Sequence, residues 1–179
     1  QLSRHIDGVL TPSIQQLEAL DRSVSETRIL IRHWLSVQSG PLDPEKVQLQ
    51  RLMDEDIPQQ VQALLPLVAN WSDPALQGQF DSLSRDIEHV FLVYREIMRL
   101  LPTFQAYEDP IAMMDAEYYA LDGSSIPAFT ESIRRHMDAM SEAQTNALRA
   151  STAQMDALGT QLQLYAGNVA LGILILGLI

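Results

Sequence analysis

Apolar residues recur at intervals of three and four along most of the chain, which is the spacing of one face of an α-helix. No stretch shows the strict apolar and polar alternation of a strand. The pattern therefore predicts an all-α protein. Four long helices are expected at about 1–38, 44–71, 74–107 and 127–163, with a short extra helix at about 110–122.

Prolines mark the expected ends and weak points of these helices. Thr11 before Pro12 has the pattern of an N-cap followed by proline at the first helical position. Pro58 and Pro66 lie within the second helix, where each removes an amide donor and crowds the carbonyl four residues earlier. We expect these two prolines to bend or loosen that helix.

The last 16 residues, 164–179, carry no charge and are mostly apolar. About 20 such residues cross the hydrocarbon core of a bilayer. We interpret this run as the start of a transmembrane helix that continues the fourth helix and extends beyond Ile179. The alternative is a buried core helix with a frayed end, although such helices usually keep a polar stripe. The chain then divides into a helical domain at 1–163 and the beginning of a membrane span.

Short connections between long helices favour an antiparallel up-down-up-down four-helix bundle. At a rise of 1.5 Å per residue, such helices would make a bundle about 40–50 Å long. In that topology both ends of the chain leave from the same end of the bundle. We therefore expect a further membrane span before Gln1.

The layout of a long first helix, two middle helices and a last helix entering a membrane resembles a known family. It is similar to the four-helix-bundle sensor domains of bacterial transmembrane receptors, such as chemoreceptors and sensor histidine kinases. The resemblance covers residues 1–165 as the bundle and 164–179 as the second span. It implies a periplasmic domain at the inner membrane, a homodimer centred on the first helix, and a cytoplasmic signalling domain, as in chemotaxis or two-component systems.

The amino-acid composition and the short motifs argue against several classes of function. The formal net charge is −11 and the pI is about 4.6, which argues against a nucleic-acid partner because such proteins present basic faces. The chain has no cysteine, so it has no disulfide and no thiolate nucleophile. It has no phosphate loop, and Asp86-x-x-His89 lacks the second such pair that a di-metal carboxylate bundle needs. We expect no enzyme activity, no cofactor and no metal site.

Arginine supplies the candidate binding residues, because the chain has only 12 basic residues against 23 acidic ones. Arg28 and Arg32 lie one turn apart in the first helix, and Arg134 and Arg135 lie near the start of the fourth. At 1.5 Å per residue, these positions fall at a similar depth in the bundle. Guanidinium groups that converge at one level suit a small anion such as a carboxylate. In aspartate-type chemoreceptors, which the chain resembles, arginines of the first helix reach the ligand.

Arg95, Arg99, His33 and Tyr118 are further candidates for the ligand site. Arg95 and Arg99 repeat the spacing of one turn on the third helix at a similar depth, and His33 adjoins the first arginine pair. Tyr118 belongs to a methionine and tyrosine cluster at 113–119, which either lines an apolar pocket or seals the end of the bundle. For the arginines, the alternative is that nearby acids neutralise them as solvated surface pairs.

These patterns lead us to expect an extracytoplasmic ligand-sensing domain that relays binding through its fourth helix into the membrane. The alternative is a membrane-anchored helical bundle that serves as a structural or protein-docking module without a small ligand. On the fourth helix, a line of apolar and small residues from Ile133 to Leu162 keeps the three-four spacing. It predicts that two copies pair along this line and along the first helix.

Overall fold

The computed structural model describes residues 2–120 and 126–176. Within these ranges the ordered elements are all helical and no strand is present. The predicted all-α fold class is therefore confirmed. The expected helix ends at residues 1 and 121–122 lie outside the described residues, as do residues 177–179 of the expected membrane segment and the side chains of 162–176.

The first helix contains a π-helical turn. It consists of α1 (Leu2–His5), the π-helical turn η1 (Ile6–Leu10) and α2 (Thr11–Ser36) in direct succession. Thr11 has helical dihedral angles, φ −62° and ψ −48°, and its N–H donates to the carbonyl of Ile6. The prediction that Thr11 caps a helix start is therefore wrong, because a cap residue leaves the helical region. The π turn directly precedes Pro12, where a wider turn relieves the crowding that the proline ring causes.

The second helix repeats this arrangement. It consists of α3 (Pro44–Arg51), the π-helical turn η2 (Leu52–Asp56) and α4 (Ile57–Val68). Asp43 caps its start, since its carboxylate accepts a hydrogen bond from the N–H of Glu45 at 2.9 Å. The N–H of Ile57 donates to the carbonyl of Leu52, five residues earlier, directly before Pro58. At Pro58 the helix therefore continues through one π-helical turn.

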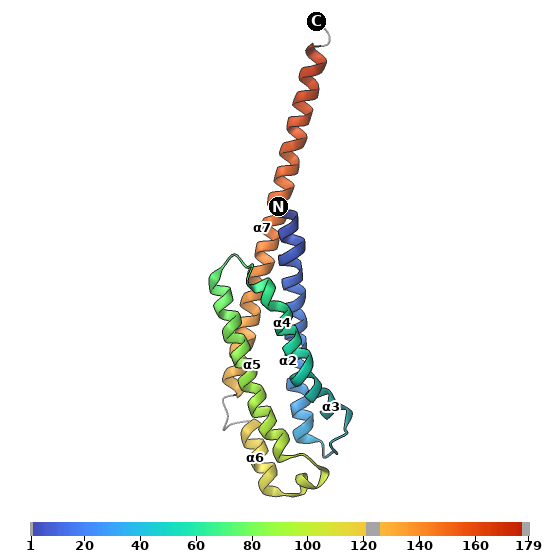
Figure 1. Cartoon of the computed structure of the whole chain (residues 1–179), viewed down its shortest axis with the longest axis vertical. Helices are drawn as coiled ribbons and strands as arrows, with labels where there is room; N and C mark the ends of the chain where they lie inside the picture. The colour runs from blue at the N-terminus through green and yellow to red at the C-terminus, as the bar shows by residue number, and fades with distance from the viewer. Residues whose placement is uncertain (1, 121–125, 177–179) are drawn as a thin grey trace.

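The third helix, α5 (Pro74–Leu100), starts at Asp73, whose carboxylate accepts from the N–H of Ala75 at 2.9 Å. It ends before the expected residue 107 because Pro102 keeps Leu101 out of the helical region, at φ −120° and ψ 55°. The 3₁₀-helix η3 (Phe104–Glu108) and α6 (Pro110–Ala120) follow. These two elements form the end of the molecule farthest from the chain termini (Figure 1).

The last helix, α7 (Ile126–Leu176), is one unbroken helix of 51 residues, or about 75 Å at 1.5 Å per residue. It joins the expected fourth helix to the expected membrane segment without a break. Figure 1 shows its second half extending beyond the rest of the molecule. Within the described residues, no helix is both long enough and apolar enough to cross a membrane.

The long helices pack along their apolar faces. The largest contact is between α5 and α7, and α2 packs against both α4 and α7. In Figure 1 the chain runs down α2, back through α3 and α4, down α5 and back along α7. Burying a Leu or Phe side chain contributes about 1.5–3 kcal/mol to stability. Fully buried apolar side chains include Leu17, Leu20, Leu49, Met53, Ile57, Leu64, Phe80, Leu83, Ile97, Ala116 and Met140.

A buried lysine closes the far end of this core. Lys46 is only 1% exposed, and its Nζ donates to the carbonyl of Ser39 at 2.9 Å. The same nitrogen lies 4.6 Å from the ring centre of Trp34 and 4.7 Å from that of Tyr107. Trp34 Nε1 donates to the carbonyl of Leu101 at 3.0 Å, and the Tyr107 hydroxyl donates to the carbonyl of Trp34 at 2.5 Å. These bonds fix α3 and η3 against the end of α2.

Candidate ligand-binding site

Arg28 and Arg32 occur one turn apart on α2, and both side chains are exposed. Neither guanidinium has an ion pair with an acidic side chain in the part of the chain that the structure describes. Like charges one turn apart on a helix repel each other. An anion bound between them would relieve that repulsion.

Two adjoining pockets between α2, α5 and α7 share Arg28. The first, which we call the Asp21 pocket, has a volume of about 280 Å³, and the second, the Arg32 pocket, has about 390 Å³. Ligand sites commonly have volumes of a few hundred Å³. Tyr94 and Thr130 also line both pockets. The apolar walls are Val24, Ile87, Val90, Phe91 and Ile133 in the first pocket, and Ile31, Leu35, Ile97, Ala120, Ile126 and Pro127 in the second.

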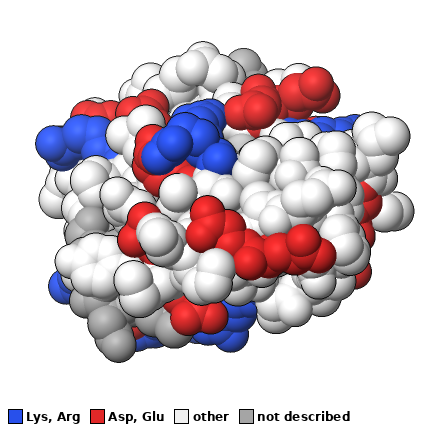
Figure 2. All heavy atoms as spheres, turned by 90° about the horizontal axis from the view of Figure 1, so that it is seen from below, with Lys and Arg blue, Asp and Glu red and all other residues white. Residues whose placement is uncertain are grey.

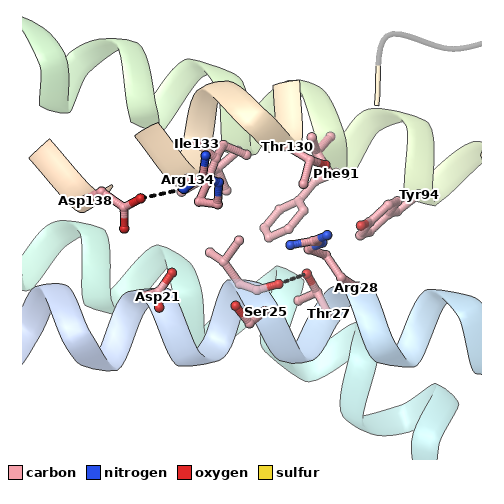
Figure 3. A pocket seen from close by; sticks show the side chains of 13 residues that line it. Asp21, Ser25, Thr27, Arg28, Phe91, Tyr94, Thr130, Ile133, Arg134 and Asp138 are labelled. Carbon is pink, nitrogen blue, oxygen red and sulfur yellow. Dashed lines mark hydrogen bonds and ion pairs between the residues drawn. The ribbon is translucent and has the colours of Figure 1, made fainter. Parts of the chain in front are cut away.

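Hydroxyl groups lie beside Arg28 where the two pockets meet. Figure 3 shows Phe91 and Tyr94 of α5 facing Arg28 of α2, with Thr130 of α7 on a third side. Tyr94 is buried, and this burial raises its pKa to about 12. Its hydroxyl therefore keeps its proton at neutral pH and remains a hydrogen-bond donor. A carboxylate held by Arg28 would compete for this donor with Thr27, whose side chain is hydrogen-bonded to the Tyr94 hydroxyl.

Arg134 also lines the Asp21 pocket, but acidic residues of its own helix occupy its guanidinium. Its Nη2 donates to Glu131 at 2.6 Å and its Nη1 to Asp138 at 2.8 Å. The hydrogen bond from Arg134 lowers the pKa of Glu131, which favours the charged carboxylate. Figure 3 shows the contact between Arg134 and Asp138 at the pocket. Arg134 thus reaches the site as a neutralised group, whereas Arg28 does not.

The other candidate arginines lie away from these pockets. Arg135 is exposed and lines neither of them. Arg95 donates to Asp54 of η2 at 2.9 Å, and Arg99 donates to Glu96 at 2.9 Å. Both contacts are ion pairs at the surface. Neutralisation by nearby acidic residues is the alternative to ligand binding that the sequence allows for all the candidate arginines.

His33 and Tyr118 also lie elsewhere. His33 Nδ1 is 2.7 Å from Glu45 Oε2, and its Nε2 is 3.7 Å from Asp43 Oδ1, so it links the end of α2 to the start of α3. Tyr118 is 60% exposed and meets Tyr119 edge to face, with ring centres 6.1 Å apart. The structure thus brings together Arg28, Arg32 and Arg134, and places the remaining candidates outside the two pockets.

Asp21, Tyr94 and Thr130 are among the pocket residues that the sequence pattern does not single out as ligand contacts. Tyr94 fits the apolar line of α5, where its hydroxyl is the one feature that signals a polar role. Asp21 lies seven residues before Arg28, two turns away, and therefore on the same helix face. For Thr130 the sequence pattern does not indicate a ligand contact, because this residue reaches the pocket only through the packing of α7 against α2.

The two pockets carry charges of both signs: Arg28 and Arg32 are cationic, whereas Asp21 and Asp138 line the first pocket and Glu131 lines the second. Two cationic groups and hydroxyl donors adjoin apolar walls, which suits a small carboxylate with an apolar portion. No group of three or more His, Cys, Asp and Glu side chains is placed to hold a metal ion within the described ranges. The site therefore offers charge and hydrogen bonds rather than metal ligands.

Comparisons with known proteins identify no relative. A scan against models of protein families gives no match, and searches of curated proteins and of solved structures give none either. The resemblance to bacterial sensor domains therefore rests on the layout and length of the helices alone.

Proposed function

We propose that the chain is the extracytoplasmic ligand-sensing domain of a bacterial transmembrane receptor, with its helices in the periplasm or outside the cell. A small anion such as a carboxylate binds where the Asp21 and Arg32 pockets meet. Arg28 and Arg32 supply the charge and the Tyr94 hydroxyl supplies a donor. In this proposal the four long helices form an antiparallel up-down-up-down bundle, and the uncharged run at 164–179 begins a span of the inner membrane.

One observation supports the proposal most directly. α7 lines the Asp21 pocket, of which Arg28 is also a part, and then continues unbroken to Leu176. A ligand that favours one packing of α7 against α2 shifts the balance between two arrangements of these helices. Ligand-driven helix shifts are typically about 1–2 Å, and the coupling is commonly about 1–3 kcal/mol. A continuous helix transmits such a shift along its length.

A thermal-shift screen against organic acids, amino acids and inorganic anions tests the binding site. We expect at least one anion to raise the melting temperature, because a ligand at about 100 times its dissociation constant stabilises a fold by about 2.7 kcal/mol. Arg28→Ala and Arg32→Ala should lose this shift. Arg95→Ala is the matched control, since it removes an exposed arginine that is already paired. The proposal fails if no anion stabilises the chain, or if Arg28→Ala responds like the wild type.

We also propose that two copies pair along the first helix and the second half of α7. On the predicted pairing line, Ile133, Met137 and Met140 are buried in the chain's own core, whereas Met155 and Leu158 are 40% and 46% exposed. Because the second half of this line on α7 is exposed, it is available for contact with a second copy. Because the chain has no cysteine, single cysteines placed at these positions should form disulfide-linked dimers. Failure to trap dimers along either helix would count against pairing.

A further inference from the structure

α6 is apolar on two opposite faces. Its inner face includes Ala116, which is fully buried, with Ala112, Met113 and Ala120 packed against the core. On the opposite face Ile111, Met114 and Tyr118 are 67%, 64% and 60% exposed. Their spacing of three and four residues places them in one line, which we call the α6 stripe. The apolar side chains of the α6 stripe are therefore left uncovered by the rest of the chain that the structure describes.

Acidic side chains border the α6 stripe on both sides. At about 100° per residue, Asp115 lies about 40° from Ile111 on one side, and Glu117 lies about 60° from Met114 on the other. Both are exposed. Glu108 and Asp109, just before α6, are exposed as well. No Lys, Arg or His occurs in the sequence between Arg99 and Arg134.

The charged side chains of α6 and of the two residues before it are therefore all acidic. Figure 2, which views this end of the molecule, shows acidic side chains lying among uncharged ones, with Lys and Arg side chains at several other places on the same face. An exposed apolar surface with a polar rim is typical of a protein interaction site. The rim charge then selects among partners and sets the rate of encounter.

We propose that the α6 stripe docks a polypeptide segment of another protein, one that presents apolar side chains bordered by lysine or arginine. Ile111, Met114 and Tyr118 would pack against the apolar side chains of the partner, and Asp115 and Glu117 would pair with its basic residues. The surface lies at the end opposite the chain termini, so it remains accessible when the other end is anchored. It is separate from the two pockets, and its test does not depend on them.

A second copy of this chain fits the surface poorly. Isologous pairing of two α6 stripes would bring Asp115 and Glu117 of one copy against the same residues of the other. Like charges facing each other at an interface are unfavourable, and the 100–133 segment has no basic side chain to offset them. The charge pattern thus favours a basic partner over self-association.

A synthetic amphipathic helix of leucine and lysine is a direct probe of this surface. A peptide of about 12 residues matches the length of α6 at 1.5 Å per residue. Binding is measured by fluorescence anisotropy of the labelled peptide, with a leucine and glutamate peptide as the charge control. We expect the lysine peptide to bind more tightly at low salt, because salt screens the rim charges, and the glutamate peptide not to bind.

Two double variants test whether the lysine peptide binds at the α6 stripe. Met114→Ser with Tyr118→Ser removes the apolar part, and Asp115→Lys with Glu117→Lys reverses the rim; each should weaken binding by about tenfold or more. The matched control is Asp81→Lys with Glu88→Lys, which changes the net charge equally at exposed positions on α5. Equal weakening by this control would overturn the proposal, because the peptide would then be sensing only net charge. Cross-linking of copies through the α6 stripe would overturn it in favour of self-association.

Discussion

Lys46 is stabilised by hydrogen bonding and by aromatic rings together. A buried ammonium group loses its hydration, and this burial lowers the pKa of Lys46. The carbonyl of Ser39 and the faces of Trp34 and Tyr107 replace part of the lost hydration. Lys46 is also the single lysine of the chain. These contacts hold Lys46 at one position in the core, and a solvent-exposed lysine would not need them.

Lys46→Ala should lower the free energy of unfolding by about 2–4 kcal/mol, because it removes a buried aliphatic stem, a hydrogen bond and two cation–π contacts. Urea unfolding followed by circular dichroism measures this change. Lys46→Met, which keeps most of the stem, should cost less. Arg22→Ala, at an exposed position of α2, should change stability by about 0.5 kcal/mol or less. An Ala variant as stable as the wild type would show that the cluster contributes little.

The sequence predicts which arginines share a helix face but not which ones remain unpaired. Arg28 with Arg32 and Arg95 with Arg99 have the same spacing of one turn. Arg95 is neutralised by Asp54, which lies 41 residues earlier in the chain. That contact depends on how α5 packs against η2, and local spacing contains no information about it. The difference between a binding residue and a surface ion pair is thus decided by tertiary packing.

At the scale of elements, each π-helical turn lies directly before a proline. Pro12 and Pro58 both lack an N–H, and the preceding residue donates to a carbonyl five residues earlier. Periodicity predicts where the long helices lie, and Asp43 and Asp73, each directly before a proline, cap two of them. The π turns are not predicted, since a proline in a helical pattern is equally compatible with a break or a kink.

One buried hydrogen bond links α2 to the connection between α4 and α5. Trp71 Nε1 donates to Ser13 Oγ at 2.9 Å, and both side chains are buried. Ser13→Ala leaves the indole N–H without this acceptor and should destabilise the fold by about 1–3 kcal/mol. Thermal unfolding monitored by Trp fluorescence measures the change. Ser25→Ala, at an exposed position on the same helix, is the matched control and should be nearly neutral; equal effects would rule out a specific role for the bond.

At the scale of the whole molecule, α7 both borders the candidate site and is the helix that we propose transmits binding. The pockets lie between α2, α5 and α7, and α7 continues far beyond them (Figure 1). The sequence predicts the long last helix from its periodicity. It does not predict that α7 borders the pockets through Thr130 and Ile133, because this requires the packing of three helices. We therefore propose that occupancy of the pockets moves α7 relative to α2.

Distance measurement between paired spin labels tests that claim most directly, and a chain without cysteine allows selective labelling. One pair is placed at Gln15 of α2 and Asn146 of α7, and a control pair at Gln15 and Gln62 of α4; all three positions are exposed. With the most stabilising anion of the thermal-shift screen at saturation, the first distance should change by about 1–2 Å. The second should stay constant, and Arg28→Ala should abolish the change. An unchanged first distance with the anion bound, or equal changes in both pairs, would contradict the account.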